Sequence, residues 1–103
     1  MPMKEDRIKT LLQASKSAGP LTVGFLLVPN FSMLAFASAL EPLRAANRMS
    51  GQNLFSWVIS SPTGAAPEAS NGVRVDVQGT PEMLQDCRLD FVCAGLEVKA
   101  HAD

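Results

Sequence analysis

Hydrophobic residues first gather in one almost unbroken run, which extends from Leu21 to Val28. A strand with apolar residues at nearly every position must be covered on both faces, and such strands are typical of the interior of a parallel α/β sheet. The run leads through Pro29 and Asn30 into a segment whose apolar residues recur every three or four positions, which predicts a helix that ends near Gly51. The folded part of the chain is therefore expected to begin with a strand and a crossover helix.

Two residues can cap this helix, because the side chain of Asn30 or of Ser32 can accept a hydrogen bond from a first-turn amide. Pro42 lies inside the helical pattern and lacks an amide donor, so we expect a kink or a break there. Arg44 and Arg48 lie on a different face from the apolar residues. We expect that face to be solvated or to contact a partner.

Two further apolar segments are expected to be strands of the same sheet. They cover Leu54–Ser60 and Leu89–Gly95, and the second ends in small residues. Between them, an Asn-Gly pair at 71–72 is a strong turn signal, which should join hairpin arms at residues 66–70 and 73–77. The second arm alternates strictly between apolar and polar residues, so we expect a strand with one wet face.

Thr80 and Pro81 form a helix start, with a capping hydroxyl and a proline at the first helical position. The helix is short and should reach about residue 85 or 86. The final segment, 96–103, is expected to begin another loop or helix. Residues 1–20 are expected to form a mobile tail, because Ser, Gly and Pro residues stop any helix there before folded structure starts at Leu21.

Composition limits the chain to one globular domain. Its 103 residues are 47% hydrophobic and 18% charged, which is typical of a folded chain. The net charge is −1, and the sequence has no basic stripe of the kind that binds nucleic acid. No apolar run approaches the ~18 residues of a membrane span, and no signal-peptide pattern follows the charged N-terminus. We therefore expect a cytoplasmic protein that contacts neither membrane nor DNA through these residues.

The two cysteines are expected to be reduced core thiols. Cys87 and Cys93 are separated by a strand-like interval, so their Cα atoms should lie roughly 15–20 Å apart, whereas a disulfide requires them within about 7 Å. Cys93 precedes an Ala-Gly pair and has the look of a reactive turn. Nothing in the sequence places a base beside it, because the only histidine is His101, near the end of the chain.

Metal and cofactor sites are not expected either. One histidine and two cysteines do not supply the ligands of a zinc site. The turn after the first strand contains no glycine, whereas a dinucleotide site requires a glycine-rich turn there. The sequence therefore predicts no catalytic residue, no metal and no cofactor.

Ligands of open α/β sheets bind outside the carboxyl ends of the strands, and two such ends can be located here. The residues at these ends are Asn30, Phe31 and Ser32 after the first strand and Ala94, Gly95 and Leu96 after the last. Gly95 permits a turn with exposed amides that can hold a carboxylate or an oxyanion. The alternative at this point is a tight strand-to-helix turn that binds no ligand.

Four stretches occur in the order and at the spacings of a known family: FSMLAFASALEPLRAANR at 31–48, FSWV at 55–58, ASNGV at 69–73 and FVCAG at 91–95. Together they resemble the N-terminal domain of GlxA-type members of the AraC transcriptional regulators. The resemblance covers residues 21 to about 100, and LEPLRAANR is its most specific part.

That family domain has the fold of the PfpI protease and class I glutamine-amidotransferase-like superfamily. The resemblance therefore implies a flavodoxin-like α/β three-layer sandwich with a mostly parallel sheet, of which residues 21–103 form the truncated first half. It also implies a sensor that binds a small, often nitrogen-containing metabolite and forms a homodimer in the full-length protein. Helix-turn-helix motifs in a C-terminal domain, expected to be missing from this chain, would read DNA.

Two departures from the superfamily's enzymes argue against catalysis. The enzymes carry a glutamate early in the first helix that supports the nucleophile, and Ser32 stands nearest to that position. Their nucleophile elbow lies on a later strand beyond residue 103, whereas Cys93 matches an earlier strand end. The alternatives are a PfpI-type hydrolase or amidase, and a small interaction protein that pairs through the face of Arg44 and Arg48. A truncated sheet also predicts aggregation, or association through an unpaired strand edge.

Overall fold

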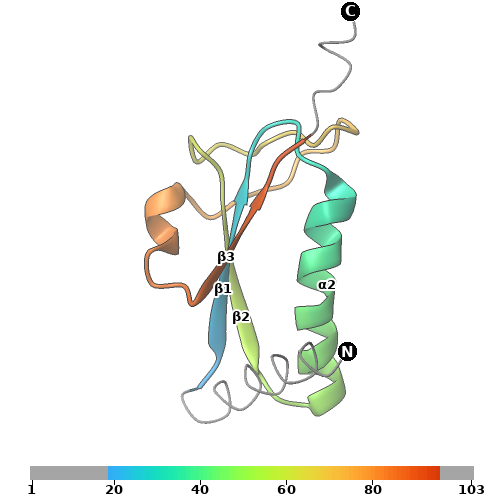
Figure 1. The fold of residues 1–103 in the computed structure, drawn as a ribbon, viewed down its shortest axis with the longest axis vertical. Coiled ribbons are helices and arrows are strands. Elements are labelled where there is room, and N and C mark those ends of the chain that lie inside the picture. Colours follow the sequence, from blue (N-terminus) through green and yellow to red (C-terminus); the bar gives the residue numbers. More distant parts are fainter. Residues whose placement is uncertain (1–18, 96–103) are drawn as a thin grey trace, which may run out of the picture.

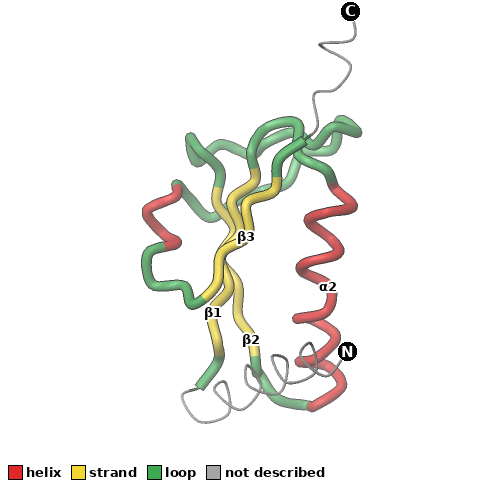
Figure 2. The backbone as a smooth tube through the Cα atoms, viewed as in Figure 1, coloured by secondary structure: helices red, strands yellow, loops and turns green. Residues whose placement is uncertain are grey.

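The computed structural model describes residues 19–95, so the expected tail up to residue 18 and the segment from Leu96 onward lie outside the described part. The described elements are β1 (Leu21–Leu27), α2 (Met33–Ser50), β2 (Phe55–Ser60), the 3-10 helix η1 (Pro81–Leu84) and β3 (Leu89–Cys93). The three strands form one parallel sheet in the order β2-β1-β3. Helix α2 covers one face of this sheet, and η1 lies on the other (Figure 1, Figure 2). The expected α/β architecture with a parallel sheet is confirmed.

β1 is the central strand, as its nearly continuous apolar sequence predicts. Val23 and Phe25 point to the α2 side and are almost completely buried. Gly24 points to the opposite side, where the side chains of Leu84 and Cys87 lie against it. Both faces of β1 are therefore covered, one by a long helix and the other by η1 and the turn that follows it.

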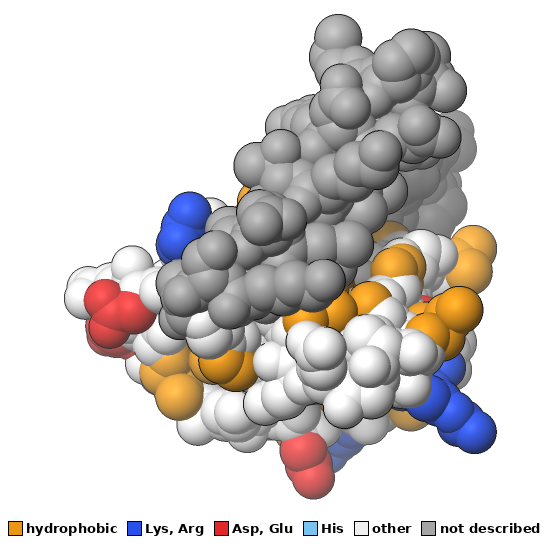
Figure 3. Space-filling view, turned by 90° about the horizontal axis from the view of Figure 1, so that it is seen from below, with side chains coloured by type: hydrophobic (Ala, Val, Ile, Leu, Met, Phe, Trp, Pro, Cys, Tyr) orange, Lys and Arg blue, Asp and Glu red, His pale blue; other side chains and the backbone are white. Residues whose placement is uncertain are grey.

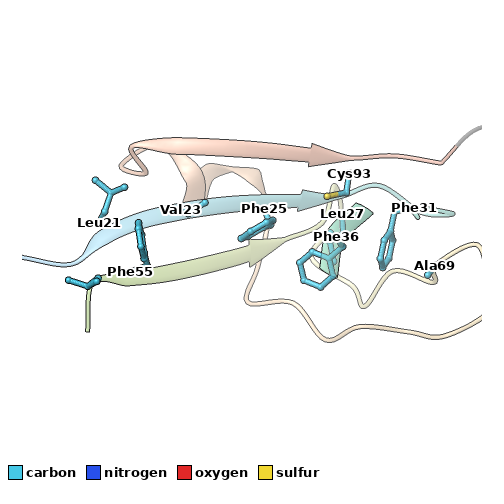
Figure 4. Close-up of a cluster of buried hydrophobic side chains, with 10 residues drawn as sticks. Leu21, Val23, Phe25, Leu27, Phe31, Phe36, Phe55, Ala69 and Cys93 are labelled. Carbon is cyan, nitrogen blue, oxygen red and sulfur yellow. The ribbon is translucent and has the colours of Figure 1, made fainter. Parts of the chain in front are cut away.

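The core between the sheet and α2 is built around Phe25 (Figure 4). Its ring packs edge-to-face on Phe36 of α2, with ring centroids 5.4 Å apart. On its other side it stacks on Phe91 of β3, also at 5.4 Å. Phe31, which precedes α2, is completely buried and packs edge-to-face on Phe36 at 6.1 Å. These aromatic contacts hold α2 and the loop before it onto the carboxyl half of the sheet.

Helix α2 begins and ends as the sequence predicts. The Ser32 hydroxyl accepts a hydrogen bond from the Ala35 amide at 3.1 Å, so Ser32 is the cap. Gly51 ends the helix in the left-handed conformation, with φ of 69°. Of the kink or break expected at Pro42, the break was wrong, because α2 runs continuously through that residue. Pro42 and Ser38 are both exposed, so water can reach the Ser38 carbonyl that position 42 leaves without an amide donor.

The side chain of Asn47 joins the end of α2 to the start of β2. Its amide nitrogen donates to the Phe55 carbonyl at 2.9 Å, and its oxygen accepts from the backbone amides of Leu54 and Phe55, both at 2.9 Å. One side chain thus fixes the position of the turn that leads into β2. Asn47 lies within the LEPLRAANR stretch that carries the family resemblance. At least one residue of this stretch therefore stabilises the fold.

The expected hairpin forms, but its second arm is not a strand. A single antiparallel bridge joins Glu68 to Arg74, and the Ala69 amide donates to the Val73 carbonyl at 2.8 Å. Beyond the bridge the chain leaves its partner arm, and the Gln78 amide donates to the carbonyl of Ile59 in β2 at 2.7 Å. The predicted strand at 73–77 was therefore wrong, although its alternation of half-buried and exposed residues is observed from 74 to 77.

The helix expected after Thr80 is the single-turn 3-10 helix η1 rather than an α-helix. Its proline stands at the first helical position as expected. The Thr80 hydroxyl does not bond a backbone amide, as a cap would, but donates to the carboxylate of Glu82. Among residues 19–95, no helix is long and apolar enough to cross a membrane.

Candidate functional site at the carboxyl end of the sheet

The strand order creates a switch point between β1 and β3. The chain leaves β1 through α2 to reach β2 on one side, and it returns to β3 on the other side. In open α/β sheets, such a point leaves a crevice outside the carboxyl ends of the two strands, where ligands bind. The loops after Leu27 and after Cys93 therefore meet at the place where the sequence analysis expected a ligand.

Asn30 and Gly95 are in direct contact at this switch point. The β1–β3 pairing continues one step past β1, since the Val28 amide donates to the Cys93 carbonyl at 3.0 Å. Asn30 then turns the chain with a φ of 72°, in the left-handed region that asparagine tolerates. A Cβ atom added to Gly95 would overlap the Asn30 carbonyl oxygen, so only glycine allows this approach.

The side chains of the other predicted site residues do not meet at one place. Phe31 contributes its ring to the core, and only its backbone faces the loops, where its carbonyl accepts from the Ser70 amide at 2.8 Å. Ser32 uses its hydroxyl as the cap of α2. Ala94 is exposed beside Gly95. Leu96 lies outside the described residues, so the described site consists of the Asn30 and Gly95 backbones with Ala94 at the rim.

A hollow of about 340 Å³ lies at the same end of the sheet, and its lining includes Pro29, the residue before Asn30, but not Asn30 or Gly95. It is lined by the residue that precedes Asn30, by the loop that follows β2 and by two charged residues of the hairpin: Pro29, Ser61, Pro62, Thr63, Ala65, Ala66, Pro67, Glu68 and Arg74. Its volume is within the range of small-molecule sites, and its lining of prolines and alanines with a few polar groups is of the kind that such sites use.

Ser61 holds the wall of the hollow in place. Its hydroxyl, which is almost fully buried, donates to the Ala65 carbonyl at 2.7 Å and accepts from the Gly64 amide at 3.0 Å. Its backbone amide donates to the Gly79 carbonyl at 3.1 Å. The loop after β2 is thus fixed at its base, and its apolar residues form a defined wall.

Glu68 and Arg74 bring opposite charges to the rim of the hollow. Their closest charged atoms, Glu68 Oε1 and Arg74 Nε, are 3.9 Å apart, at the outer limit of an ion pair. The two side chains are 55% and 74% exposed, so solvent weakens their attraction. The Glu68 carbonyl accepts from the Asn30 amide at 2.7 Å, which ties this rim to the switch point. The rim therefore offers a carboxylate and a guanidinium that a bound molecule can engage.

The thiols show no activation. Both cysteines are free, as expected. Burial raises the pKa of the Cys93 thiol. Burial also raises the pKa of the Cys87 thiol, and the carboxylates of Asp90 and Asp86 raise it further. An activated cysteine requires a lowered pKa. Within the described part of the chain, no three acidic, cysteine or histidine side chains come together as a metal site would require.

The hollow was not predicted from the sequence, because residues 61–67 carry no pattern beyond that of a loop. The usable signal was topological, since this loop follows a parallel strand and must therefore emerge at the same sheet end as Asn30. The pairing of Glu68 with Arg74 could also have been predicted from the sequence. An Asn-Gly turn with arms at 66–70 and 73–77 sets the Glu68 and Arg74 positions near each other across the hairpin.

Comparison with known proteins identifies several regulators over most of this chain. The chain is 40% identical over 90 residues to the HTH-type transcriptional regulator GlxA of Rhizobium meliloti, which is 87% of this chain and 28% of that protein. It is 47% identical over 73 residues to the HTH-type transcriptional regulator CdhR of Pseudomonas aeruginosa, covering 71% of the chain and 21% of CdhR. The HTH-type transcriptional regulator GbdR of the same species is 33% identical over 84 residues, or 82% of this chain and 23% of GbdR.

The chain thus spans about a quarter of the length of the curated relatives that it matches. Among solved structures, an AraC family transcriptional regulator from Pseudomonas putida superposes with a TM-score of 0.68 at 28% identity, over 76% of this chain and 42% of the other. No protein-family model matches the sequence.

Proposed function

We propose that this chain, which belongs to the GlxA-type AraC family of HTH-type transcriptional regulators over the segment that it shares with them, is part of an effector-sensing domain. In this proposal a small metabolite binds at the carboxyl end of the sheet and controls DNA binding by a helix-turn-helix domain outside these 103 residues. The observation that carries the proposal is the hollow beside the β1–β3 switch point in a chain whose relatives are named regulators.

The finer fold assignment is part of the same proposal. We assign residues 21–103 to the first half of a PfpI/class I glutamine-amidotransferase-like domain and residues 1–20 to a tail. The parallel strand order β2-β1-β3 supports this assignment, because flavodoxin-like sheets begin with the order 2-1-3. A crossover helix on one face of the sheet is also in keeping with it.

The chemistry of the hollow favours a small zwitterion as the effector. A guanidinium binds a carboxylate through two parallel hydrogen bonds, and a carboxylate binds an ammonium group. Arg74 and Glu68 supply these two groups at one rim, and the prolines and alanines of the wall suit a short apolar stem. The Glu68–Arg74 ion pair is long and exposed, so it contributes little free energy. A ligand that separates the two side chains therefore gives up little stabilisation when it binds. This class agrees with the nitrogen-containing metabolite that the family resemblance implies.

A PfpI-type hydrolase is not favoured by any contact at this site. The Ser32 hydroxyl is engaged as a helix cap, where the superfamily's enzymes carry an acid. Cys93 is buried, and its thiol pKa is raised rather than lowered. We therefore propose a binding role without catalysis.

A titration by calorimetry tests the proposed ligand class. The probes are β-alanine, which carries a carboxylate and an ammonium group, and its two halves propionate and propylammonium, which carry one each. We expect β-alanine to bind with a Kd on the order of 1 mM, since it has few atoms. Each half should bind at least about tenfold more weakly, because it engages one charge only.

Substitutions at the rim of the hollow test which side chains contact β-alanine. Arg74→Gln should weaken β-alanine binding by at least about tenfold, and Glu68→Gln should act in the same direction. The matched control is Arg88→Gln, because Arg88 is also exposed but precedes β3, at the amino end of the sheet. Equal binding of all three probes, or an equal loss in the Arg88 variant, would contradict the proposal.

A further inference from the structure

The tip of the hairpin places an asparagine directly before a glycine. Asn71 and Gly72 are both exposed, and they are the one Asn-Gly pair in the sequence. Gly72 has a φ of 90°, in the left-handed region. A Cβ atom added to Gly72 would meet one atom of the described residues outside its chain neighbours, Glu68 Oε2 at 3.8 Å. The backbone nitrogen of Gly72 is thus not shielded by a side chain of its own, and it can attack the side chain of Asn71.

Two groups of the hairpin suit such an attack. The Val73 amide donates to Asn71 Oδ1 at 3.0 Å, so it is aimed at the oxygen that becomes negative when Asn71 Cγ is attacked. Glu68 Oε1 faces Arg74 Nε at 3.9 Å, whereas Glu68 Oε2 faces the open side of Gly72. A carboxylate in this place can take the proton of the Gly72 amide, directly or through one water molecule. The hairpin therefore supplies both a donor for the oxyanion and an acceptor for the proton.

One hydrogen bond opposes the attack. The Gly72 amide donates to the Ala69 carbonyl at 2.9 Å. This bond lies at an exposed loop tip, where local opening costs little free energy. The arms remain joined through the Ala69 amide and the Val73 carbonyl, 2.8 Å apart. Opening of the one bond to the Ala69 carbonyl therefore frees the Gly72 nitrogen without unfolding the hairpin.

We infer that Asn71 is a self-modification site, which the Gly72 nitrogen attacks while Glu68 accepts the proton. The products are a succinimide and then a mixture of aspartate and isoaspartate at position 71. This inference goes beyond the proposed function, and the conversion does not depend on effector binding.

The steps balance with water as the only co-reactant. A bond forms between the Gly72 nitrogen and Asn71 Cγ as the amide proton passes to Glu68. The bond from Cγ to the side-chain nitrogen then breaks, and Glu68 returns the proton so that ammonia leaves. Water opens the succinimide ring at one of its two carbonyls. Opening at Cγ gives aspartate, and opening at the backbone carbonyl gives isoaspartate, in which the main chain passes through Cβ.

Conversion changes the hairpin that carries the rim of the hollow. Both products add a negative charge to the tip, and isoaspartate also lengthens the main chain between the arms by a methylene group. The pairing of hairpin arms depends on the length of the connecting loop. The Glu68 carbonyl remains bonded to the Asn30 amide at 2.7 Å, so the first arm stays fixed and the second arm, with Arg74, moves. An aged chain therefore loses the arrangement of Glu68 and Arg74 seen in the fresh chain.

Peptide mapping by mass spectrometry measures the conversion of each asparagine in the native chain near neutral pH. We expect Asn71 to convert at least about tenfold faster than Asn53. Asn53 is the matched comparison, because it is also exposed but precedes the buried Leu54. It follows α2 and precedes β2, at the end of the molecule that Figure 3 shows.

Glu68→Gln tests the proton acceptor, because glutamine keeps the size of the side chain but does not take up a proton. It should slow the conversion of native Asn71 at least about fivefold. Arg74→Gln is the control, since it breaks the same ion pair and leaves the carboxylate. It should change the rate by less than about twofold, because the exposed pair is weak. In urea, the parent and Glu68→Gln chains should convert at equal rates, since the folded hairpin is absent there.

Equal native rates in the parent and Glu68→Gln chains would overturn the inference, and so would conversion of Asn53 as fast as that of Asn71. An equally large effect of Glu68→Gln in urea would also overturn it, because the local sequence rather than the folded hairpin would then set the rate. The β-alanine titration of freshly prepared chain tests the effector site separately. A failure to bind there has no bearing on the rates at Asn71.

Discussion

Gly95, which follows β3, lies directly against the backbone carbonyl of Asn30, which follows β1. Any side chain at position 95 must displace backbone, because the obstructing atom is a carbonyl oxygen and not the end of a flexible side chain. The contact joins the two loops of the switch point. The shape of the candidate site depends on how closely these loops approach each other. Substitution at Gly95 is therefore expected to alter both stability and the site.

We predict that Gly95→Ala lowers the free energy of unfolding by about 1–3 kcal/mol, the usual cost of inserting a methyl group where there is no room. Urea unfolding followed by circular dichroism measures the change. The matched control is Ala94→Ser, because Ala94 is exposed and its substitution should change stability by less than about 0.5 kcal/mol. A Gly95→Ala chain as stable as the control would show that the two loops are not in contact.

Asn47 provides a second prediction, because its side chain makes three hydrogen bonds to the start of β2. Asn47→Ala should lower the free energy of unfolding by about 1–3 kcal/mol, since it removes the partners of half-buried backbone groups. Asn47→Asp keeps the two acceptor contacts and should cost less than the alanine variant. Gln52→Ala, in the same turn but exposed, is the control. Equal stability of the alanine and aspartate variants would contradict this account of the side chain.

The Ser32 cap makes a third prediction. Ser32→Ala should cost about 1 kcal/mol, because the Ala35 amide loses its acceptor. Ser32→Asp should retain the parent stability, since a carboxylate caps a helix and interacts favourably with its amino end. Thermal unfolding of the parent chain and the two variants measures their order of stability. If the alanine variant were as stable as the parent, the hydroxyl would not act as the cap, and Ser32 would be open to another role at the sheet end.

The thiols make a fourth prediction, which concerns pH. Burial raises the pKa of the Cys93 thiol and of the Cys87 thiol in the folded chain. Unfolded thiols ionise at their usual pKa near ~8.5. The stability of the fold should therefore be unaffected by the thiols below that pH and should fall as the pH rises through it, because the unfolded state releases its thiol protons first. The chain contains no tyrosine, whose ionisation would otherwise overlap at higher pH.

Alkylation by iodoacetamide followed by mass spectrometry checks the thiols one by one. At pH 8 both should react more slowly in the native chain than in urea, because less thiolate is present. Cys93 should be the slower, since it is only 6% exposed. Rapid modification of native Cys93 near neutral pH would contradict the buried-thiol account and would favour the hydrolase alternative.

The sequence predicted the elements whose signals are local. The apolar run at 21–28 identified the central strand, and Ser32 and Gly51 marked the limits of α2 because capping depends on a few neighbouring residues. The contact between the loops after β1 and β3 was also predictable, because parallel strands bring their carboxyl ends to the same edge.

Each miss has its own physical cause. Alternation at 73–77 reports which side chains are buried but not whether the backbone has a strand to pair with, and here Gln78 and Gly79 contact β2 instead. Of the kink or break expected at Pro42, the break did not occur, and both Pro42 and Ser38, whose carbonyl lacks an amide partner, are exposed residues. The hollow depends on how the loop from Ser61 folds back, which is set by hydrogen bonds of a buried hydroxyl rather than by a sequence pattern.

The central claim is that a small effector binds in the hollow beside the β1–β3 switch point, and amide chemical shifts test it most directly. A ¹⁵N-labelled chain titrated with β-alanine should show saturable shifts that gather at the lining amides of Thr63, Ala65, Ala66, Glu68 and Arg74, with smaller shifts at Asn30 and Gly95. The amides at the amino end of the sheet, such as that of Arg88, should not move. Shifts that fail to saturate, or that gather away from the hollow, would contradict the claim.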